Sequence, residues 1–286
     1  MSNSHQFDSL TRFIFEDHDI RGEIVRLNAS YQQIIQQHQY AEPIAWLVGE
    51  ALLAAVLLTA SIKFEGNLTL QFQSDGPLKL LVAKCNHLFE IRGLAQLRDE
   101  KMAAQLNNEM LLGNGQLVVT IQPENQQESY QSVIALTSNG IANAIEIYFA
   151  QSEQLPTRIF LSADKNQCVG MLLQALPEQK SKEREFFWEH AVKLGETITD
   201  KELQELPNEM ILHRLYHEED IRIFPAENIR FRCTCNRNRM ENAVQLLGEE
   251  DAMDLLKDKH FIEVKCEFCS EVFNFDKVDV AEIFKR

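Results

Sequence analysis

Two pairs of cysteines near the carboxyl end constrain this chain most. Cys233 and Cys235 are separated by one residue, and Cys266 and Cys269 follow after thirty more, with two residues between them. A Cys-x-x-Cys turn directs two sulfurs toward one centre, and a Cys-x-Cys pair does the same if the chain bends at its middle residue. Four thiolates from two segments form a tetrahedral site, which zinc fills best among common intracellular metals. The spacing therefore predicts that these four cysteines bind one Zn²⁺.

The composition is that of an ordinary globular protein with an acidic balance. Of the 286 residues, 45% are apolar and 25% are charged, and the formal net charge is −15. Such a charge repels nucleic-acid phosphates unless basic residues are concentrated locally, and residues 232–286 carry nine Lys or Arg against twelve Asp or Glu. We therefore expect no nucleic-acid partner.

The longest apolar stretch runs from Ile44 to Ala60, follows Pro43 and contains Glu50. It is short for a membrane span, and proline suits the first turn of a helix, so we expect a buried core helix and no membrane partner. The amino terminus has neither the basic start nor the apolar run of a secretory signal. These features predict a cytoplasmic protein, in which clustered cysteines indicate metal or redox chemistry rather than structural disulfides.

Period-two alternation predicts many strands in the first 177 residues. Leu68 to Gln73 alternates and runs into a turn signature at 74–77, after which Leu78 to Val82 returns as the second strand of a hairpin. Further strands are predicted at 13–15, 22–27, 87–94, 116–122, 130–136, 157–162 and 169–175, and helices at 30–38, 43–60 and 139–151. Hairpins with interspersed helices predict an α+β fold, with antiparallel or mixed sheets in a large domain over 1–177.

This large domain offers no catalytic motif. It contains no nucleotide-binding loop, no nucleophile elbow and no paired carboxylates at a telling spacing, so we expect that the protein is not an enzyme. Cys85 and Cys168 stand alone in strand-like sequence and are predicted to be small core residues. Lys63-Phe-Glu-Gly66 and Asp75-Gly-Pro77 fit either a pocket wall or plain turns.

A charged run at 177–185 predicts an exposed boundary, followed by a helical linker over 178–230. Thr199 to Glu202 matches a capping box, and Pro207 starts another helix with apolar residues on one face. His213 and His217 have the spacing of a metalloprotease helix, but the glutamate required after the first histidine is missing, so we interpret them as surface or packing residues. The linker helices are short and amphipathic, and they must lay their apolar faces on another surface.

Residues 231–286 form a predicted small zinc-binding domain, with helices at 240–247, 249–257 and 276–284 and strands at 261–265 and 271–275. A unit of this size has a thin core and commonly needs a metal to fold. Structural zinc contributes about 10–16 kcal/mol of apparent binding free energy in small peptides. Because whole domains are stable by only about 5–15 kcal/mol, removing zinc is expected to unfold this unit.

The chain closely resembles the heat shock protein 33 family of bacterial redox-regulated holdase chaperones over essentially its whole length. The resemblance rests most specifically on the run Phe231 to Arg239, which includes the Cys-x-Cys pair, and on Cys266-Glu-Phe-Cys269. The other matching segments are Leu215 to Glu219, Lys63 to Gly66, Asp75 to Pro77, Gly113 to Gly115 and Ser152 to Arg158. Met240 is a departure, since some relatives carry a further cysteine there.

The resemblance implies a chaperone that is inactive when its four thiolates hold zinc and active after oxidation. It implies one disulfide between Cys233 and Cys235 and another between Cys266 and Cys269, with zinc released. Unfolded or partly unfolded client proteins are the implied partners during oxidative stress, no ATP is required, and the active form is expected to be a homodimer.

Two other functions remain open from the residues alone. The first is a zinc-ribbon nucleic-acid binder, against which the acidic balance argues. The second is a thiol oxidoreductase using Cys266 and Cys269, although this pair lies between two predicted strands rather than at a helix start, where thiolates are activated.

Overall fold

The structure is a computed structural model in which residues 8–99, 108–125, 128–137, 139–177 and 182–285 are described. The chain divides into two compact units, Met1–Phe231 (unit 1) and Arg232–Arg286 (unit 2). Part of the predicted exposed boundary, residues 178–181, lies outside the described residues.

Unit 1 contains two six-stranded sheets. Sheet A has the order β10-β1-β2-β9-β8, and β11 also pairs with β1. Sheet B has the order β12-β5-β4-β3-β6-β7, in which β12 pairs with β5 in parallel and the other neighbours are antiparallel. The strands of sheet A are β1 (Ser9–Phe15), β2 (Ile20–Leu27), β8 (Thr157–Ala163), β9 (Cys168–Ala175), β10 (Ile221–Ile223) and β11 (Glu227–Asn228). Those of sheet B are β3 (Gly66–Ser74), β4 (Leu78–Asn86), β5 (Glu90–Leu97), β6 (Gly115–Pro123), β7 (Tyr130–Ala135) and β12 (Arg230–Phe231). The predicted α+β class is confirmed.

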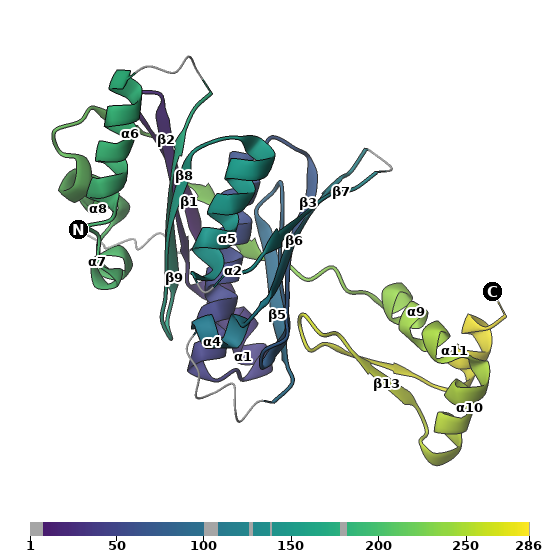
Figure 1. Cartoon of the computed structure of the whole chain (residues 1–286). Helices are drawn as coiled ribbons and strands as arrows, with labels where there is room; N and C mark the ends of the chain where they lie inside the picture. Colours follow the sequence, from purple (N-terminus) through teal and green to yellow (C-terminus); the bar gives the residue numbers. More distant parts are fainter. Residues whose placement is uncertain (1–7, 100–107, 126–127, 138, 178–181, 286) are drawn as a thin grey trace. The chain divides into compact units, whose positions relative to one another are not determined.

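Helix α2 (Glu42–Ser61) is the core of unit 1 and lies between the two sheets (Figure 1). Its sequence is apolar on all sides, so burial of its whole circumference is the stable arrangement. Among the described residues it is the one helix long and apolar enough to cross a membrane, and 78% of that stretch is buried. The predicted core helix is therefore confirmed. Around it lie α1 (Ala29–His38), α4 (Asn108–Leu112) and α5 (Gly140–Tyr148), which a π-helical turn, η1 (Phe149–Glu153), continues.

Apolar and polar residues alternate along β3, as the sequence predicted, and the apolar face of sheet B packs on α2. Leu68, Leu70 and Phe72 of β3 are fully buried in the cluster that contains α2, while the residues between them are less buried. Strand β9 is different, because all eight of its residues are buried. A strand that is buried on both faces must be covered on both sides, which points to a further layer beyond sheet A.

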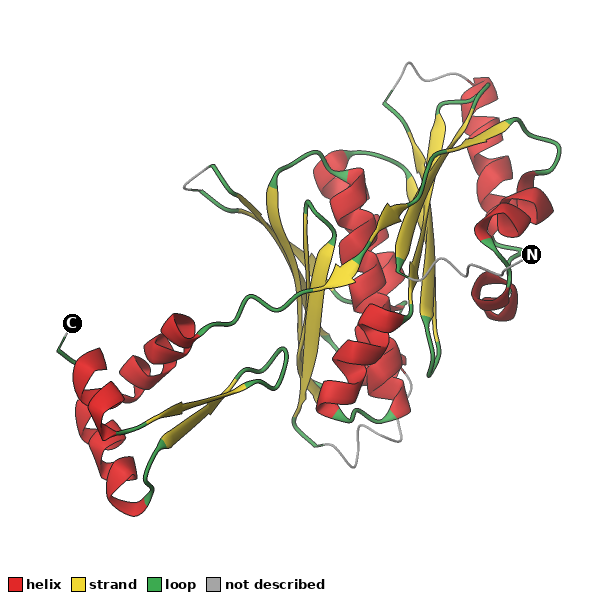
Figure 2. Cartoon of the chain, turned by 180° about the vertical axis from the view of Figure 1, so that it is seen from behind, coloured by secondary structure: helices red, strands yellow, loops and turns green. Residues whose placement is uncertain are grey.

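That layer consists of three helices, α6 (Lys182–Gly195), α7 (Asp200–Glu205) and α8 (Asn208–Tyr216). Both cartoon views show them on the outer face of sheet A, opposite α2 (Figures 1 and 2). The predicted capping box is present, since the Thr199 side chain accepts from the Glu202 amide and the Glu202 carboxylate accepts from the Thr199 amide. One apolar cluster joins the helices to the sheet: Phe13, Phe15, Ile20, Ile24, Val169, Met171 and Leu173 from the strands, and Phe187, Ala191, Leu203, Ile211, Leu212, Leu215 and Tyr216 from the helices. The amphipathic linker helices therefore bury their apolar faces on sheet A.

A Gly22→Ala substitution is expected to loosen this contact. Gly22 pairs with Phe13 across β1 and β2, and a Cβ added to it would lie 2.0 Å from Phe13 Cζ. The Phe13 ring is fully buried and packs against Phe15 at a centroid distance of 6.1 Å, so it has no free space to move into. Overpacking of this kind costs about 1–3 kcal/mol, measurable as a lower melting temperature.

The matched control is the same substitution in a Phe13→Leu background. Gly22→Ala should cost less there, because the smaller side chain leaves room for the methyl group. An equal cost in both backgrounds would show that the ring does not set the requirement for glycine.

Unit 2 is built from α9 (Arg237–Leu247), α10 (Glu249–Asp258), the hairpin of β13 (Ile262–Lys265) and β14 (Val272–Phe275), and α11 (Lys277–Ile283). Every one of these elements was predicted from the sequence. Its buried apolar cluster contains six residues: Val244, Ala252, Ile262, Phe275, Val280 and Ile283. This core is small, as the length of the unit predicts.

Candidate metal centre

Two loops of unit 2 bring four cysteine sulfurs together. Cys233 and Cys235 precede α9, and Cys266 and Cys269 lie in the turn between β13 and β14. All four sulfur atoms lie within 4.8 Å of one another. Two of the separations join one loop to the other, since Cys233 Sγ is 3.7 Å from Cys266 Sγ and Cys235 Sγ is 3.3 Å from Cys269 Sγ. The four residues singled out by spacing thus share one centre.

Local hydrogen bonds shape both loops. Asn236 caps α9 by accepting from the Arg239 amide at 2.9 Å, which turns the chain immediately after Cys235. In the other loop the Ser270 amide donates to the Cys266 carbonyl and the Cys266 amide donates to the Glu271 carbonyl, both at 2.8 Å. Ser270 adopts a left-handed conformation, with φ at 59°, to complete this tight turn. Both loops are therefore set by the backbone and not by the sulfurs alone.

The arrangement fits a tetrahedral metal ion bound by thiolates. A zinc ion with Zn–S bonds of about 2.3 Å separates its sulfurs by about 3.8 Å, within the range found in the cluster. Four sulfur donors favour a soft or borderline metal such as Zn²⁺ over Mg²⁺ or Ca²⁺, which prefer oxygen. All six cysteines of the chain are free thiols, so the geometry is that of the reduced protein.

Hydrogen bonding within the cluster makes the thiols unequal as acids. Burial raises the pKa of Cys233, but hydrogen bonds from the Cys235 backbone and from neighbouring thiols outweigh it and lower the pKa overall. Burial and hydrogen bonds with Cys269 and Cys233 raise the pKa of Cys235 well above that of a free thiol, and burial raises the pKa of Cys269 to about 11. A cation bound by all four sulfurs must displace the remaining protons, so its affinity falls as the pH falls.

Basic residues near the cluster hold unit 2 together. Arg237 pairs with Asp279 at 2.7 Å, and its guanidinium lies 4.6 Å from the centroid of the Phe275 ring. Arg239 donates to the Thr234 carbonyl at 2.9 Å, inside the Cys-x-Cys loop. These contacts join α9 to β14, α11 and the loop, so the loop geometry and the small core support each other.

The other candidate residues lie elsewhere. Cys85 and Cys168 are buried core residues of unit 1, as predicted, and burial raises the pKa of Cys85 to about 12. The rings of His213 and His217 lie 6.0 Å apart on the exposed side of α8. Among the described residues, the four-cysteine cluster is the only group of three or more side chains arranged to hold a metal ion.

The two turn motifs of unit 1 have different roles. Lys63, Phe64 and Glu65 line a cavity of about 870 Å³ at the end of α2, which agrees with the pocket interpretation. Asp75 is a turn residue, and its Oδ1 accepts from the Asn114 amide at 3.0 Å.

Glu23, which the sequence did not single out, is buried close to the end of α2. Its Oε2 accepts from the Ser61 hydroxyl at 3.2 Å, and its Oε1 has no hydrogen-bond partner among the described residues. Burial raises the pKa of Glu23 to about 7, although Arg21 and Arg12 act in the opposite direction. Its neighbours Val25 and Ile24 gave it the pattern of a strand residue, which carries no signal of a buried charge.

This pKa predicts a pH dependence of stability. Between pH 4.5, the ordinary value, and about 7, the folded chain keeps a proton on Glu23 that the unfolded chain releases. The free energy of unfolding should therefore fall as the pH rises through this window, by on the order of 3 kcal/mol. In a Glu23→Gln protein the melting temperature should no longer fall as the pH rises through this window. A Glu128→Gln protein, changed at an exposed position, should keep the fall. An unchanged slope in Glu23→Gln would contradict the assignment.

A segment between α8 and the first cysteine was also missed. Strands β10, β11 and β12 all lie within residues 221–231, and none was predicted. The alternation of Ile221, Arg222 and Ile223 was a weak signal for the first of them.

Comparisons with known proteins agree with one another. The sequence model of the family described as Hsp33 protein matches residues 8–276. A "33 kDa chaperonin" from Azotobacter vinelandii is 42% identical over 282 residues, covering 97% of this chain and 95% of the relative. Another from Shewanella woodyi is 43% identical over 279 residues, covering 98% and 96%.

A crystal structure has the same fold. That of the 33 kDa chaperonin (heat shock protein 33 homolog) from Thermotoga maritima superimposes with a TM-score of 0.83 at 24% identity. The match covers 97% of this chain and 98% of that one. The sequence match over nearly the whole length, together with this fold, confirms the resemblance: the chain belongs to the Hsp33 family of chaperones.

Proposed function

We propose that the chain is a redox-regulated, ATP-independent holdase that binds unfolding proteins during oxidative stress. The observation that carries the proposal is the cluster of four free thiols within 4.8 Å, on a unit whose apolar cluster has six buried members among the described residues. We assign residues 231–286 as the redox-switch domain, residues 178–230 as the helical linker and residues 1–177 as the client-binding domain.

In the reduced state Cys233, Cys235, Cys266 and Cys269 would hold one Zn²⁺. When bound, zinc keeps the four sulfurs as thiolates and ties the two loops together, which stabilises a unit of this size by more than its core can. The redox chemistry belongs to the cysteines. Hydrogen peroxide oxidises one thiolate of a pair to a sulfenic acid and releases hydroxide. The thiolate of the near partner then attacks that sulfur, forming the disulfide and releasing a second hydroxide, and the solvent protonates both.

Two such reactions, one at Cys233 and Cys235 and one at Cys266 and Cys269, consume two peroxides and all four ligands. This pairing follows the family, and each partner lies within three residues of the other, so no large chain movement is needed. The Cys-x-Cys disulfide closes a very small ring, which makes it strained and readily reduced again.

Loss of the metal would then unfold unit 2 and weaken the anchorage of the linker. Helices α6 to α8 cover the seven apolar side chains that sheet A contributes to the second cluster. Their departure would create a contiguous apolar face on a rigid sheet, the kind of surface that marks a protein-binding site. The net charge of −15 would keep the opened protein soluble while it holds a client.

The proposal includes a cytoplasmic location, because the thiols must stay reduced before stress. It also includes a homodimer as the active form, which the family resemblance implies. No enzymatic turnover is proposed, and no nucleic acid or membrane is needed.

An aggregation assay with a thermally unfolding client tests the proposal. The reduced, zinc-loaded protein should fail to suppress light scattering, and the peroxide-treated, zinc-free protein should suppress it. Equal suppression in both states would refute the switch. Salt-sensitive binding of RNA or DNA would favour the zinc-ribbon alternative, and turnover of a disulfide substrate by zinc-free protein would favour an oxidoreductase.

A further inference from the structure

Residues 220–231, here called the strap segment, lie along one edge of each sheet of unit 1. Strand β10 pairs with β1 at Phe13 to Phe15, and β11 pairs with β1 at Ser9 and Leu10. Strand β12 then crosses to sheet B and pairs with Glu90 and Ile91 of β5. The segment ends two positions before Cys233, so it directly connects the linker helices to the metal centre.

Backbone hydrogen bonds hold the strap segment along the edge of β1. The Glu16 amide donates to the Asp220 carbonyl at 2.9 Å, the Phe224 amide donates to the Arg12 carbonyl at 2.9 Å, and the Ile229 amide donates to the Asp8 carbonyl at 2.8 Å. If the segment left, these groups of β1 would form an unpaired edge, which readily accepts another extended chain.

Three apolar side chains add to this attachment: Ile229 belongs to the cluster around α2, Phe231 packs against that cluster, and Ile221 packs against the cluster under α6 to α8. Ile229 is the one buried side chain of the strap segment, at 4% exposure, while Ile223 and Phe224 are each 39% exposed. Glu227 pairs with Arg12, and their side chains are 46% and 35% exposed. Arg230 pairs with the buried Glu90 at 2.5 Å but is itself 64% exposed. The exposed pair of Glu227 and Arg12 contributes about 0–1 kcal/mol. Separation of the strap segment therefore mainly costs the burial of Ile229 and the pairing of the buried Glu90 carboxylate with Arg230.

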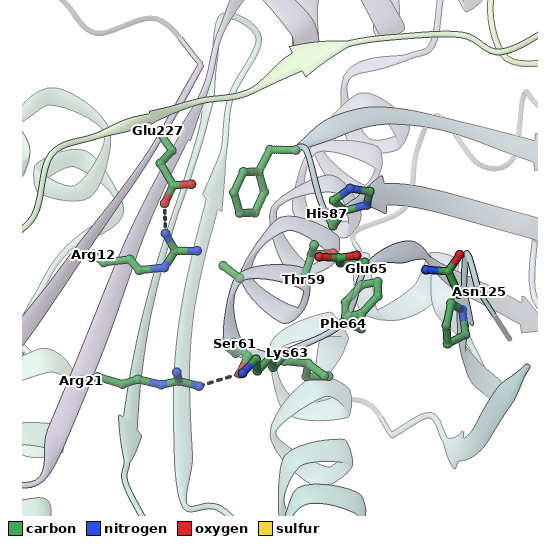
Figure 3. A pocket seen from close by; sticks show the side chains of 14 residues that line it. Arg12, Arg21, Thr59, Ser61, Lys63, Phe64, Glu65, His87, Asn125 and Glu227 are labelled. Atoms are coloured by element: carbon green, nitrogen blue, oxygen red, sulfur yellow. Dashed lines mark hydrogen bonds and ion pairs between the residues drawn. The ribbon is translucent and has the colours of Figure 1, made fainter.

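A cavity lies beside the strap segment, and its lining includes Glu227 of the segment and Arg12 of β1. Figure 3 shows Glu227 facing Arg12 on one side of it, with His87 and Glu65 on the other. Its volume is about 870 Å³, enough for several side chains. Departure of Glu227 would leave Arg12 without that carboxylate partner at the rim of the cavity.

We propose that the outer edge of β1, from Asp8 to Glu16, is a docking site for an extended apolar segment of a client once the strap segment has left. The client segment pairs with β1 as an added antiparallel strand. An apolar residue occupies the position of Ile229, and an acidic residue is favoured at that of Glu227. The inference rests on the proposed function, since it requires an active state in which the linker has moved.

Two observations favour an unfolding polypeptide as the occupant. The strap segment is itself an extended chain on this edge, so it shows what the edge accepts. The edge also continues the proposed client-binding face, because Phe13 and Phe15 of the same strand belong to the cluster that α6 to α8 cover. Main-chain pairing is independent of sequence, which suits a protein that must hold many different clients.

The test uses the full chain and a labelled synthetic peptide copying residues 220–231. Fluorescence anisotropy should show binding to the oxidised, zinc-free protein and at least about tenfold weaker binding to the reduced, zinc-loaded protein, whose edge is covered. A control peptide N-methylated at Phe224 and Ile229 loses the amide donors to the Arg12 and Asp8 carbonyls and should bind about tenfold more weakly. In the aggregation assay, excess of the unmodified peptide should reduce client protection by the oxidised chain, and the methylated peptide should not.

The outcomes separate this inference from the proposed function. Equal binding of the two peptides, or client protection that survives saturating unmodified peptide, overturns the docking edge while the holdase proposal stands. Failure of the oxidised chain to protect a client without any peptide overturns both.

Discussion

A Cys235→Ser protein is expected to lose tight zinc binding and to unfold its carboxyl-terminal unit. Cys235 Sγ lies 3.3 Å from Cys269 Sγ and 3.3 Å from Glu271 Oε2, inside the cluster, and a serine hydroxyl is a poor ligand for zinc. If each of four thiolates supplies a quarter of a binding free energy of about 10–16 kcal/mol, the loss is about 3 kcal/mol, or roughly a hundredfold in affinity.

The small core of unit 2 cannot offset that loss. Zinc titration with a competing chelator should measure the weaker affinity, and hydrogen exchange of unit 2 should measure the unfolding. Cys85→Ala is the matched control, because it removes a thiol from the core of unit 1 and should leave the zinc affinity unchanged. Normal zinc affinity in Cys235→Ser would contradict the four-ligand site. An intact Cys266 and Cys269 oxidoreductase activity in the same protein would support that alternative.

An Ile211→Asp protein is expected to hold clients even when it is reduced and zinc-loaded. Ile211 is fully buried in the cluster between α8 and sheet A. Removing a large aliphatic side chain from such a site costs about 2–5 kcal/mol, and burying an unpaired carboxylate adds to that cost. Helix α8 should therefore leave the sheet, while unit 2 keeps its four ligands and its own core.

Met210→Asp is the matched control, because Met210 is the preceding residue of α8 and is 53% exposed. It should retain zinc and remain inactive until oxidised. Aggregation suppression, zinc content and limited proteolysis of α6 to α8 together measure the effect, and Ile211→Ala provides a milder change if the aspartate disrupts folding. Release of the helices without client protection would show that the face of sheet A does not bind clients.

Much of the architecture could be predicted because its signals are local. The alternation of Leu68, Leu70 and Phe72 marks a half-buried strand, and the capping residues Thr199 and Glu202 mark a helix start within four positions. The two spacings of the cysteine pairs likewise indicate one centre, because each pair is set by a turn that the sequence encodes itself. These predictions depend on few distant contacts.

The strap segment could not be predicted because its structure depends on residues that are distant in the sequence. Its strands are two or three residues long and pair with β1 and β5, whose residues lie more than a hundred positions earlier in the chain. The ion pair between Arg230 and Glu90 spans 140 positions, and neither residue has a pattern that identifies the other. Glu23 is a similar case, because its burial results from the end of α2 packing nearby and not from its own neighbours in sequence.

The central claim is that four cysteines and one metal ion act as a single redox switch. The most direct test measures zinc content and free thiols of the full chain before and after treatment with peroxide. Four thiols and one zinc should be lost together, with Cys85 and Cys168 still reduced because both are buried in the core. Loss of those four thiols with zinc still bound, or zinc release with the four thiols intact, would contradict it.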